Sequence, residues 1–270
     1  MGPDGATERL LRRDRTIVIV AIMAMTAIAS TYTVLGVGMD MPAYKMTRMP
    51  GVRDAGGMSG ATMARAWSPA YAVLVFFMWW VMMVAMMLPS AAPAILLHSS
   101  LKRLSSPAST NAAAFLAGYL AVWALFSLVA TGLHWGLESV GVLSASMMTM
   151  KGGPLAGGVL ILAGLYQFTS LKHACLAHCQ SPAEYLAANH RPGRNGAFRM
   201  GVGHGIYCLG CCWSLMALLF VGGVMNLWWI AGLAILVALE KLLPSGARIA
   251  RISGGAMIVS GLVLAAGSFI

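Results

Sequence analysis

The chain has 270 residues, of which 59% are hydrophobic and 10% are charged, with a mean hydropathy of +0.78 and a formal net charge of +10. A soluble domain of this length needs about a quarter of its residues charged to cover its surface, so the composition argues against an ordinary soluble protein. Lipid as the solvent explains the missing polar surface. The basic residues lie mainly between apolar runs. We therefore interpret the positive charge as an orientation signal that meets anionic lipid headgroups, and not as a nucleic-acid surface.

Seven apolar stretches approach the roughly 20 residues that a helix needs to cross a bilayer core. In chain order they are 16–36, 69–97, 112–134, 152–171, 201–220, 226–243 and 249–270. The first stretch is long and lacks a small-residue cleavage site, so it is interpreted as a span and not as a signal peptide. The sequence thus predicts an all-α, polytopic transmembrane helical bundle of about seven spans, or six if one stretch is re-entrant. Residues 16–270 form a single transmembrane domain behind a basic segment, 1–15.

Lysine and arginine predict the orientation, because cytoplasmic loops are enriched in both. Four arginines precede the first span, and the basic residues that alternation places on the same side are Lys102, Arg103, Lys172, Arg191, Arg194, Arg199, Lys241, Arg248 and Arg251. The loop at 37–68 is the exception, since it also holds four basic residues. We expect a multi-pass protein with a cytoplasmic N-terminus, a C-terminus outside, an outer loop at 37–68 and an inner loop at 172–200.

All five cysteines lie between Cys175 and Cys212. In the fifth predicted span, His204, Cys208, Cys211 and Cys212 are offset by four, seven and eight residues, so they share one helix face. Thiolate and imidazole suit soft and borderline ions such as Cu(I) and Zn(II). A reducing cytosol and an odd number of cysteines argue against structural disulfides. We favour a metal or redox site over the alternative, in which the cysteines pack as small hydrophobes and a backbone carbonyl holds the histidine.

A second group of candidate ligands precedes this span. Cys175 and Cys179 are four residues apart, so one helical turn presents both thiols together, and His173 and His178 are nearby in the sequence. The spacing is not that of a zinc finger. We predict that this group binds metal together with the fifth span. The alternative is a solvated basic loop whose thiols are incidental.

Methionine is frequent, with 21 in the chain. The second predicted span carries two adjacent stripes at intervals of four, formed by Met78, Met82 and Met86 and by Met83 and Met87. The outer loop holds six more, which are Met39, Met41, Met46, Met49, Met58 and Met63. Thioether is a soft, neutral ligand that binds Cu(I) without losing a proton. Methionine also fills apolar cores, and packing is the simpler interpretation of the stripes on the second span.

Charged side chains inside a membrane are costly and are therefore candidates for function. Glu240 lies near the inner end of the sixth predicted span, where we interpret it as a residue that either snorkels to the membrane surface or pairs with the adjacent Lys241. His134 and Glu138 are four residues apart at the outer end of the third span. We interpret them as interfacial polar residues, with an outer ligand set as the alternative.

Three stretches of the chain carry a resemblance when they are taken together. The first reads MWWVMMVAMMLPS from Met78 to Ser90, the second reads YQFTSLKHAC from Tyr166 to Cys175, and the third reads GHGIYCLGCCW from Gly203. They resemble a bacterial family of uncharacterised integral membrane proteins described as predicted metal-binding. The resemblance covers about residues 70–245, and it implies a membrane fold and metal binding without an established reaction.

Three functional hypotheses follow. We favour a soft-metal protein of the bacterial inner membrane, with copper as the preferred ion, that transports the ion or delivers it to a copper-dependent membrane enzyme or a metallochaperone. The second hypothesis is a membrane thiol oxidoreductase that exchanges electrons with a quinone, with Cys208 and Cys211 as the redox pair and Cys175 and Cys179 as the shuttle pair. The third is a structural subunit of a membrane complex.

These hypotheses share further expectations. The chain contains no Gly-x-x-x-x-Gly-Lys nucleotide-binding loop, so we expect any transport to be passive or driven by a gradient. Under the favoured hypothesis the protein is a binding protein and not an enzyme, and it works as a homo- or hetero-oligomer in the lipid bilayer.

Overall fold

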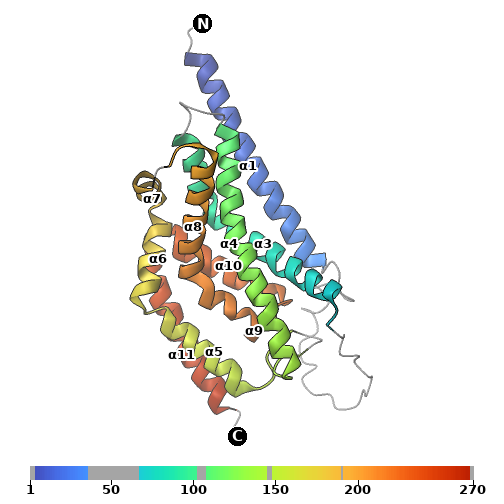
Figure 1. Cartoon of the computed structure of the whole chain (residues 1–270). Coiled ribbons are helices and arrows are strands. Elements are labelled where there is room, and N and C mark those ends of the chain that lie inside the picture. The colour runs from blue at the N-terminus through green and yellow to red at the C-terminus, as the bar shows by residue number, and fades with distance from the viewer. Residues whose placement is uncertain (1–3, 36–66, 102–107, 145–147, 190, 268–270) are drawn as a thin grey trace.

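The computed structural model describes residues 4–35, 67–101, 108–144, 148–189 and 191–267. Regular structure in these ranges is helical, apart from one isolated bridge between Leu143 and Met150. The helices, drawn in Figure 1, are α1 (Asp4–Leu35), α3 (Pro69–Leu101), α4 (Ala108–Ser139), α5 (Gly153–Tyr166), α6 (Ser170–Gln180), α7 (Pro182–Ala188), α8 (Gly193–Ala217), α9 (Leu219–Gly222), α10 (Leu227–Leu242) and α11 (Gly246–Ala266). The predicted all-α class is confirmed.

Within the described ranges, five segments are long and apolar enough to cross a membrane: Val18–Leu35, Pro69–Ser99, Asn111–Ser139, Gly193–Gly222 and Gly246–Ala266. The helices α5 and α6 make a sixth if the pair is one span, bent by 64° at its break. The predicted count of seven is therefore not reached in the part of the chain that the structure describes. The helix α10 is the reason, because its 16 residues rise about 24 Å, less than the roughly 30 Å of a bilayer core.

The segment 172–200, predicted as an inner loop, is largely helical. Thr169 starts a new helix after α5, because its side chain accepts a hydrogen bond from the backbone N–H of Lys172 and so caps α6. The short helix α7 follows, and α8 begins at Gly193 rather than at residue 201. This bend directs α6 toward the middle of α8, where the candidate ligands lie.

Two close helix pairs organise the bundle. In Figure 1, α4 runs along α8 and α5 runs along α11, and α1 begins at the opposite end of the molecule from the end of α11. A Cβ atom added to Gly157 would lie 2.5 Å from the carbonyl oxygen of Gly261, and one added to Gly164 would lie 2.7 Å from that of Gly254. The backbones of α5 and α11 therefore approach so closely that only glycine fits between them.

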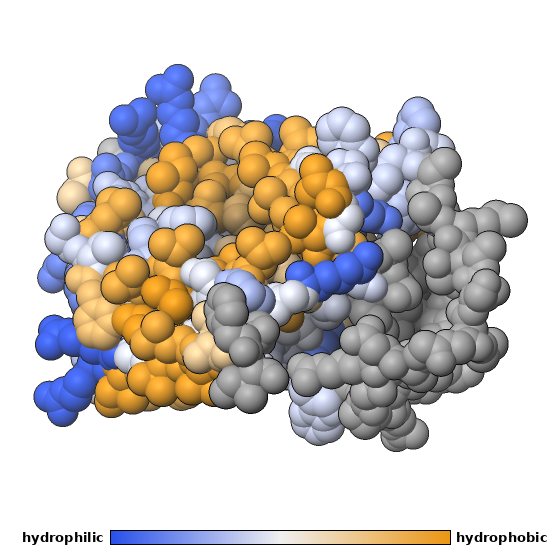
Figure 2. Space-filling model, turned by 90° about the horizontal axis from the view of Figure 1, so that it is seen from below, coloured by the Kyte–Doolittle hydropathy of each residue, from blue (hydrophilic) through white to orange (hydrophobic). Residues whose placement is uncertain are grey.

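The interior and the surface are both apolar. The largest fully buried side chains include Trp79, Tyr119 and Trp123, which belong to the hydrophobic core. Ile28 and Ile252 are nevertheless 71% and 70% exposed, and Figure 2 shows hydrophobic side chains over much of the lower face. Apolar surface of this extent marks a protein that meets lipid or other proteins.

The glycine contacts give a matched pair of substitutions in α5. Gly157→Ala places a methyl group against the backbone of α11, so we expect a lower melting temperature in detergent, from an overpacking cost of about 1–3 kcal/mol. Gly158→Ala places the same methyl group in open space, and should leave the melting temperature unchanged or raise it because alanine favours the helix. Equal melting temperatures for the two variants would contradict the close packing of α5 on α11.

Candidate metal centre

The helices α6, α8 and α10 converge where the cysteines lie. Cys179 is in the last turn of α6, while Cys208, Cys211 and Cys212 are in the second half of α8. The helix α10 ends at the same place, with Lys241 as its penultimate residue. The three cysteines of α8 are almost completely buried. The face of α8 that carries Cys208, Cys211 and Cys212 therefore points into the bundle, as the helical spacing of these residues in the sequence predicts.

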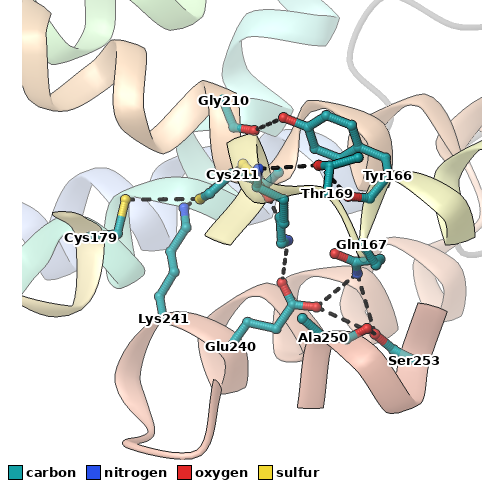
Figure 3. Close-up of polar contacts among 12 residues, drawn as sticks. Tyr166, Gln167, Thr169, Cys179, Gly210, Cys211, Glu240, Lys241, Ala250 and Ser253 are labelled. Atoms are coloured by element: carbon teal, nitrogen blue, oxygen red, sulfur yellow. Dashed lines mark hydrogen bonds and ion pairs between the residues drawn. The ribbon is translucent and has the colours of Figure 1, made fainter. Parts of the chain in front are cut away.

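The sulfur atoms form a compact cluster, part of which is drawn in Figure 3. Cys179 Sγ lies 3.9 Å from Cys211 Sγ, and Cys212 Sγ lies 3.8 Å from Met87 Sδ of α3. The Cys211 and Cys212 thiols donate to the carbonyl oxygen of Cys208, at 3.1 and 2.9 Å. Two sulfurs bound to one ion at about 2.3 Å each are at most about 4.6 Å apart. Cys179 and Cys211 can thus share an ion without any movement of α6 or α8.

Lys241 is a member of this cluster that residue spacing does not predict, and Tyr119, whose hydroxyl lies 3.1 Å from Cys208 Sγ, is another. Lys241 Nζ donates to Cys208 Sγ at 2.9 Å, and it lies 3.8 Å from Cys212 Sγ and 3.9 Å from Met87 Sδ. Of the two interpretations of Glu240, pairing with Lys241 is wrong, because adjacent residues on a helix point about 100° apart and Glu240 pairs with Lys172. A lysine near the end of a largely apolar helix is the signal that could have identified Lys241.

Glu240 pairs instead with Lys172 of α6. Glu240 Oε2 lies 2.6 Å from Lys172 Nζ, and Glu240 Oε1 accepts a hydrogen bond from Gln167 Nε2 at 2.9 Å (Figure 3). Lys172 also donates to the carbonyl oxygen of Cys211. The side chain of Lys172 is completely buried, which argues against the alternative interpretation of this segment as a solvated basic loop. The ion pair ties α6 to α10 and fixes the backbone of α8 at the thiol cluster.

The helices α6 and α10 both end at the cluster. Gln180, the last residue of α6, donates from Nε2 to the carbonyl oxygens of Glu240 at 2.8 Å and Leu243 at 3.1 Å. These bonds satisfy carbonyl groups that a helix C-terminus otherwise leaves without partners. A helix C-terminus carries a partial negative charge, so two of them directed at one place favour a cation there.

A cavity of about 160 Å³ opens beside the sulfurs. Its lining combines ligand types from three helices with the proline-containing turn of α3, and consists of Ser90, Ala91, Pro93, Ala94, Cys179, Gln180, Pro182, His204, Cys208, Lys241 and Leu242. His204 Nδ1 is buried and has no hydrogen-bond partner among the described residues. The described residues contain no preformed group of three or more His, Cys, Asp and Glu side chains able to hold a metal ion. The geometry therefore offers a site of two sulfur atoms, those of Cys179 and Cys211, next to a cavity.

The remaining candidates of α6 lie away from the cavity. Cys175 is buried, and its Sγ packs so closely on Gly210 that an added Cβ would lie 2.7 Å away. His173 is half-buried on α6, and His178 is exposed and stacks on Tyr207 with ring centroids 4.2 Å apart. Of the second predicted group, the structure therefore brings only Cys179 to the centre.

Tyr185 of α7 closes the cluster on the side of His204. The two ring centroids are 5.8 Å apart, and the Tyr185 hydroxyl donates to the carbonyl oxygen of Met200 at 2.9 Å. Burial raises the pKa of Tyr185 to about 12, so the hydroxyl keeps its proton and remains a donor.

The methionine stripes of α3 are buried in the bundle. The five residues are between 0 and 4% exposed, and they are Met78, Met82, Met83, Met86 and Met87. All five belong to the hydrophobic core, and Met87 also contacts the thiol cluster. The six predicted methionines of the outer loop lie outside the described residues.

His134 and Glu138 lie near the other end of the methionine stripes. Trp79, adjacent to Met78, donates from Nε1 to His134 Nδ1 at 3.5 Å, and His134 Nε2 is 3.9 Å from Glu138 Oε2. Glu138 also accepts a hydrogen bond from Trp67 Nε1 at 2.9 Å. His134 is completely buried inside the bundle, where Trp79 and Glu138 are its neighbours.

One comparison with known proteins gives a match. The family described as PpoB2, a copper chaperone, matches residues 76–264, which include the complete cluster of cysteines, Met87 and Lys241. No curated protein and no solved structure matches the chain at a significant level.

The buried ion pair gives a test of the architecture of this centre. Lys172→Leu leaves the Glu240 carboxylate buried without a cation, so we expect a loss of about 3–5 kcal/mol in the free energy of unfolding. The double variant Lys172→Leu/Glu240→Leu removes both charges and should recover most of that loss. Chemical unfolding of the purified protein in detergent measures both. A double variant that is no more stable than Lys172→Leu alone would contradict the pairing.

Proposed function

Because the chain belongs to the PpoB2 copper chaperone family, we propose that it binds Cu(I) at the sulfur cluster between α6 and α8 and delivers the ion to a copper-dependent partner. The observation that carries the proposal is the distance of 3.9 Å between Cys179 Sγ and Cys211 Sγ, on two different helices. Thiolate is a soft ligand that suits Cu(I). The family match supports copper handling, and the partner, such as a copper enzyme or a metallochaperone, is part of the proposal.

Binding needs no electron transfer. The ion forms two bonds to sulfur, two S–H bonds break, and both protons leave to water in the adjacent cavity. His204 lies at the cavity wall with an unsatisfied ring nitrogen, so it can act as a further ligand or receive one of these protons. Cys208 and Cys179 line the same cavity. A thiol or thioether of the partner that enters there can take over the ion one ligand at a time.

We also propose that the bundle lies in the bacterial inner membrane, with the N-terminus in the cytoplasm and the C-terminus outside. Five helices of spanning length, together with exposed apolar side chains on α1 and α11, support membrane embedding. The buried methionines of α3 extend from His134 to the thiols and can pass a soft ion between thioethers and thiolates. These buried methionines are the proposed route by which a soft ion reaches the cysteines.

Membrane embedding is tested by alkaline carbonate extraction of membranes from cells that express the protein. We expect the chain to stay in the membrane pellet and to be released only by detergent, because its exposed apolar surface needs lipid. A peripheral protein that is expressed in the same cells serves as the control. Release of the chain into the carbonate supernatant would contradict the proposal.

Copper binding is tested by elemental analysis of the protein purified anaerobically in mild detergent. The wild type should hold about one copper ion per chain, and Cys179→Ser or Cys211→Ser should lose most of it because each removes one of two thiolates. Cys175→Ser is the matched control, since Cys175 is buried on the same helix but does not line the cavity. Equal copper in all four proteins would exclude the proposed site.

The same samples test the thiol oxidoreductase hypothesis. That hypothesis pairs Cys208 with Cys211 and Cys175 with Cys179. In the structure the close pair of sulfur atoms is Cys179 and Cys211, and the Cys211 thiol donates to the carbonyl oxygen of Cys208. A disulfide between Cys179 and Cys211 that forms only with added quinone, in protein that binds no copper, would favour the oxidoreductase.

A further inference from the structure

A buried cation touches the sulfur atoms of the candidate centre. Lys241 Nζ contacts Cys208 Sγ at 2.9 Å and lies 3.8 Å from Cys212 Sγ, and only 5% of the residue is exposed. The nearby charges of Lys172 and Glu240 cancel in their ion pair. Among the described residues, Lys241 has no carboxylate partner, so it adds one positive charge to the cluster.

The position of this charge is fixed by the surrounding structure. Lys241 follows Glu240, which is held by Lys172 and Gln167, and the end of α10 is held by Gln180. Only 5% of the residue is exposed, and its ammonium group contacts three sulfur atoms at the wall of the cavity, so the charge stays beside the thiols. Any ion that binds to the thiolates must therefore be accommodated next to a fixed positive charge.

The charge count depends on the valence of the ion. A monovalent cation held by two thiolates gives a complex of charge −1, which Lys241 brings to zero. A divalent cation held by the same two thiolates is neutral, and Lys241 then leaves an uncompensated charge of +1 inside the bundle. A third thiolate would compensate a divalent ion, but no three candidate ligands converge in the described part of the chain. Uncompensated buried charge is strongly unfavourable.

We propose that Lys241 makes the centre selective for a soft monovalent cation, Cu(I) or Ag(I), over a divalent cation such as Zn(II), by balancing the charge of a bis-thiolate complex. The inference rests on the proposed function, because it requires metal binding at these sulfurs. In the binding step two S–H bonds break, two metal–sulfur bonds form, and both protons leave to cavity water without electron transfer.

The experiment is a competition between Ag(I) and Zn(II) on the purified full chain in detergent under anaerobic conditions, with bound metal quantified by elemental analysis. The wild type should retain Ag(I) in preference to Zn(II). Lys241→Leu should reduce the ratio of bound Ag(I) to bound Zn(II) by at least about tenfold, because the loss of one nearby charge favours the neutral divalent complex. Lys241→Gln is a second neutral variant, which keeps a polar end and should give the same shift if Lys241→Leu does not fold.

Two controls separate the local charge from other effects. Lys241→Arg keeps the charge and should keep the wild-type ratio within about threefold. Arg248→Leu removes one charge from an exposed position in α11 and should leave the ratio unchanged. An equal shift in Arg248→Leu would overturn the inference, because net charge alone would then explain it.

The outcomes also separate this inference from the proposed function. If the wild type binds Ag(I) and the neutral variants keep its preference, the role of Lys241 is overturned while the thiol site stands. If the wild type binds neither ion, the proposed function fails and the inference fails with it.

Discussion

The burial of charge inside an apolar bundle is the constraint on which the rest of the structure depends. Lys172, Glu240 and Lys241 are each at most 5% exposed, and such charges are tolerated only when they are paired or hydrogen-bonded. The Lys172–Glu240 pair joins residues 68 positions apart, and Lys172 also bonds to the backbone at Cys211. Satisfying these groups holds α6, α8 and α10 in one arrangement, and this arrangement brings the sulfur atoms together.

The same constraint explains why two helices end in the interior. The helix α10 stops after 16 residues, α6 turns by 64° from α5, and Gln180 satisfies carbonyl groups at the junction. Interrupted helices inside a membrane are tolerated where they line a cavity, and their ends place partial charges next to an ion. Here the ends surround a cavity of about 160 Å³ that gives access to Cys179 and Cys208. The break in regular structure is thus what makes the thiols reachable.

A protein that hands on copper must hold the ion and still release it. A site with two close thiols, a cavity and a neighbouring cation fits that requirement better than a closed four-ligand site, which retains its metal for structural purposes. The membership in a copper chaperone family agrees with this arrangement. The proposed role of the buried methionines is a route of weaker ligands that leads to the stronger ones.

The sequence by itself determined the all-α class, the shared interior face of Cys208, Cys211 and Cys212, and a family resemblance that implies metal binding. These properties follow from hydropathy and from helical periodicity, which are local along the chain. The tertiary structure alone decided that Cys179 reaches the centre while Cys175 does not, that Glu240 pairs with Lys172, and that Lys241 lies among the sulfurs. The physical reason is that these contacts depend on where α6 bends, where α10 ends and how both pack on α8, and none of these is set by the spacing of residues within one helix.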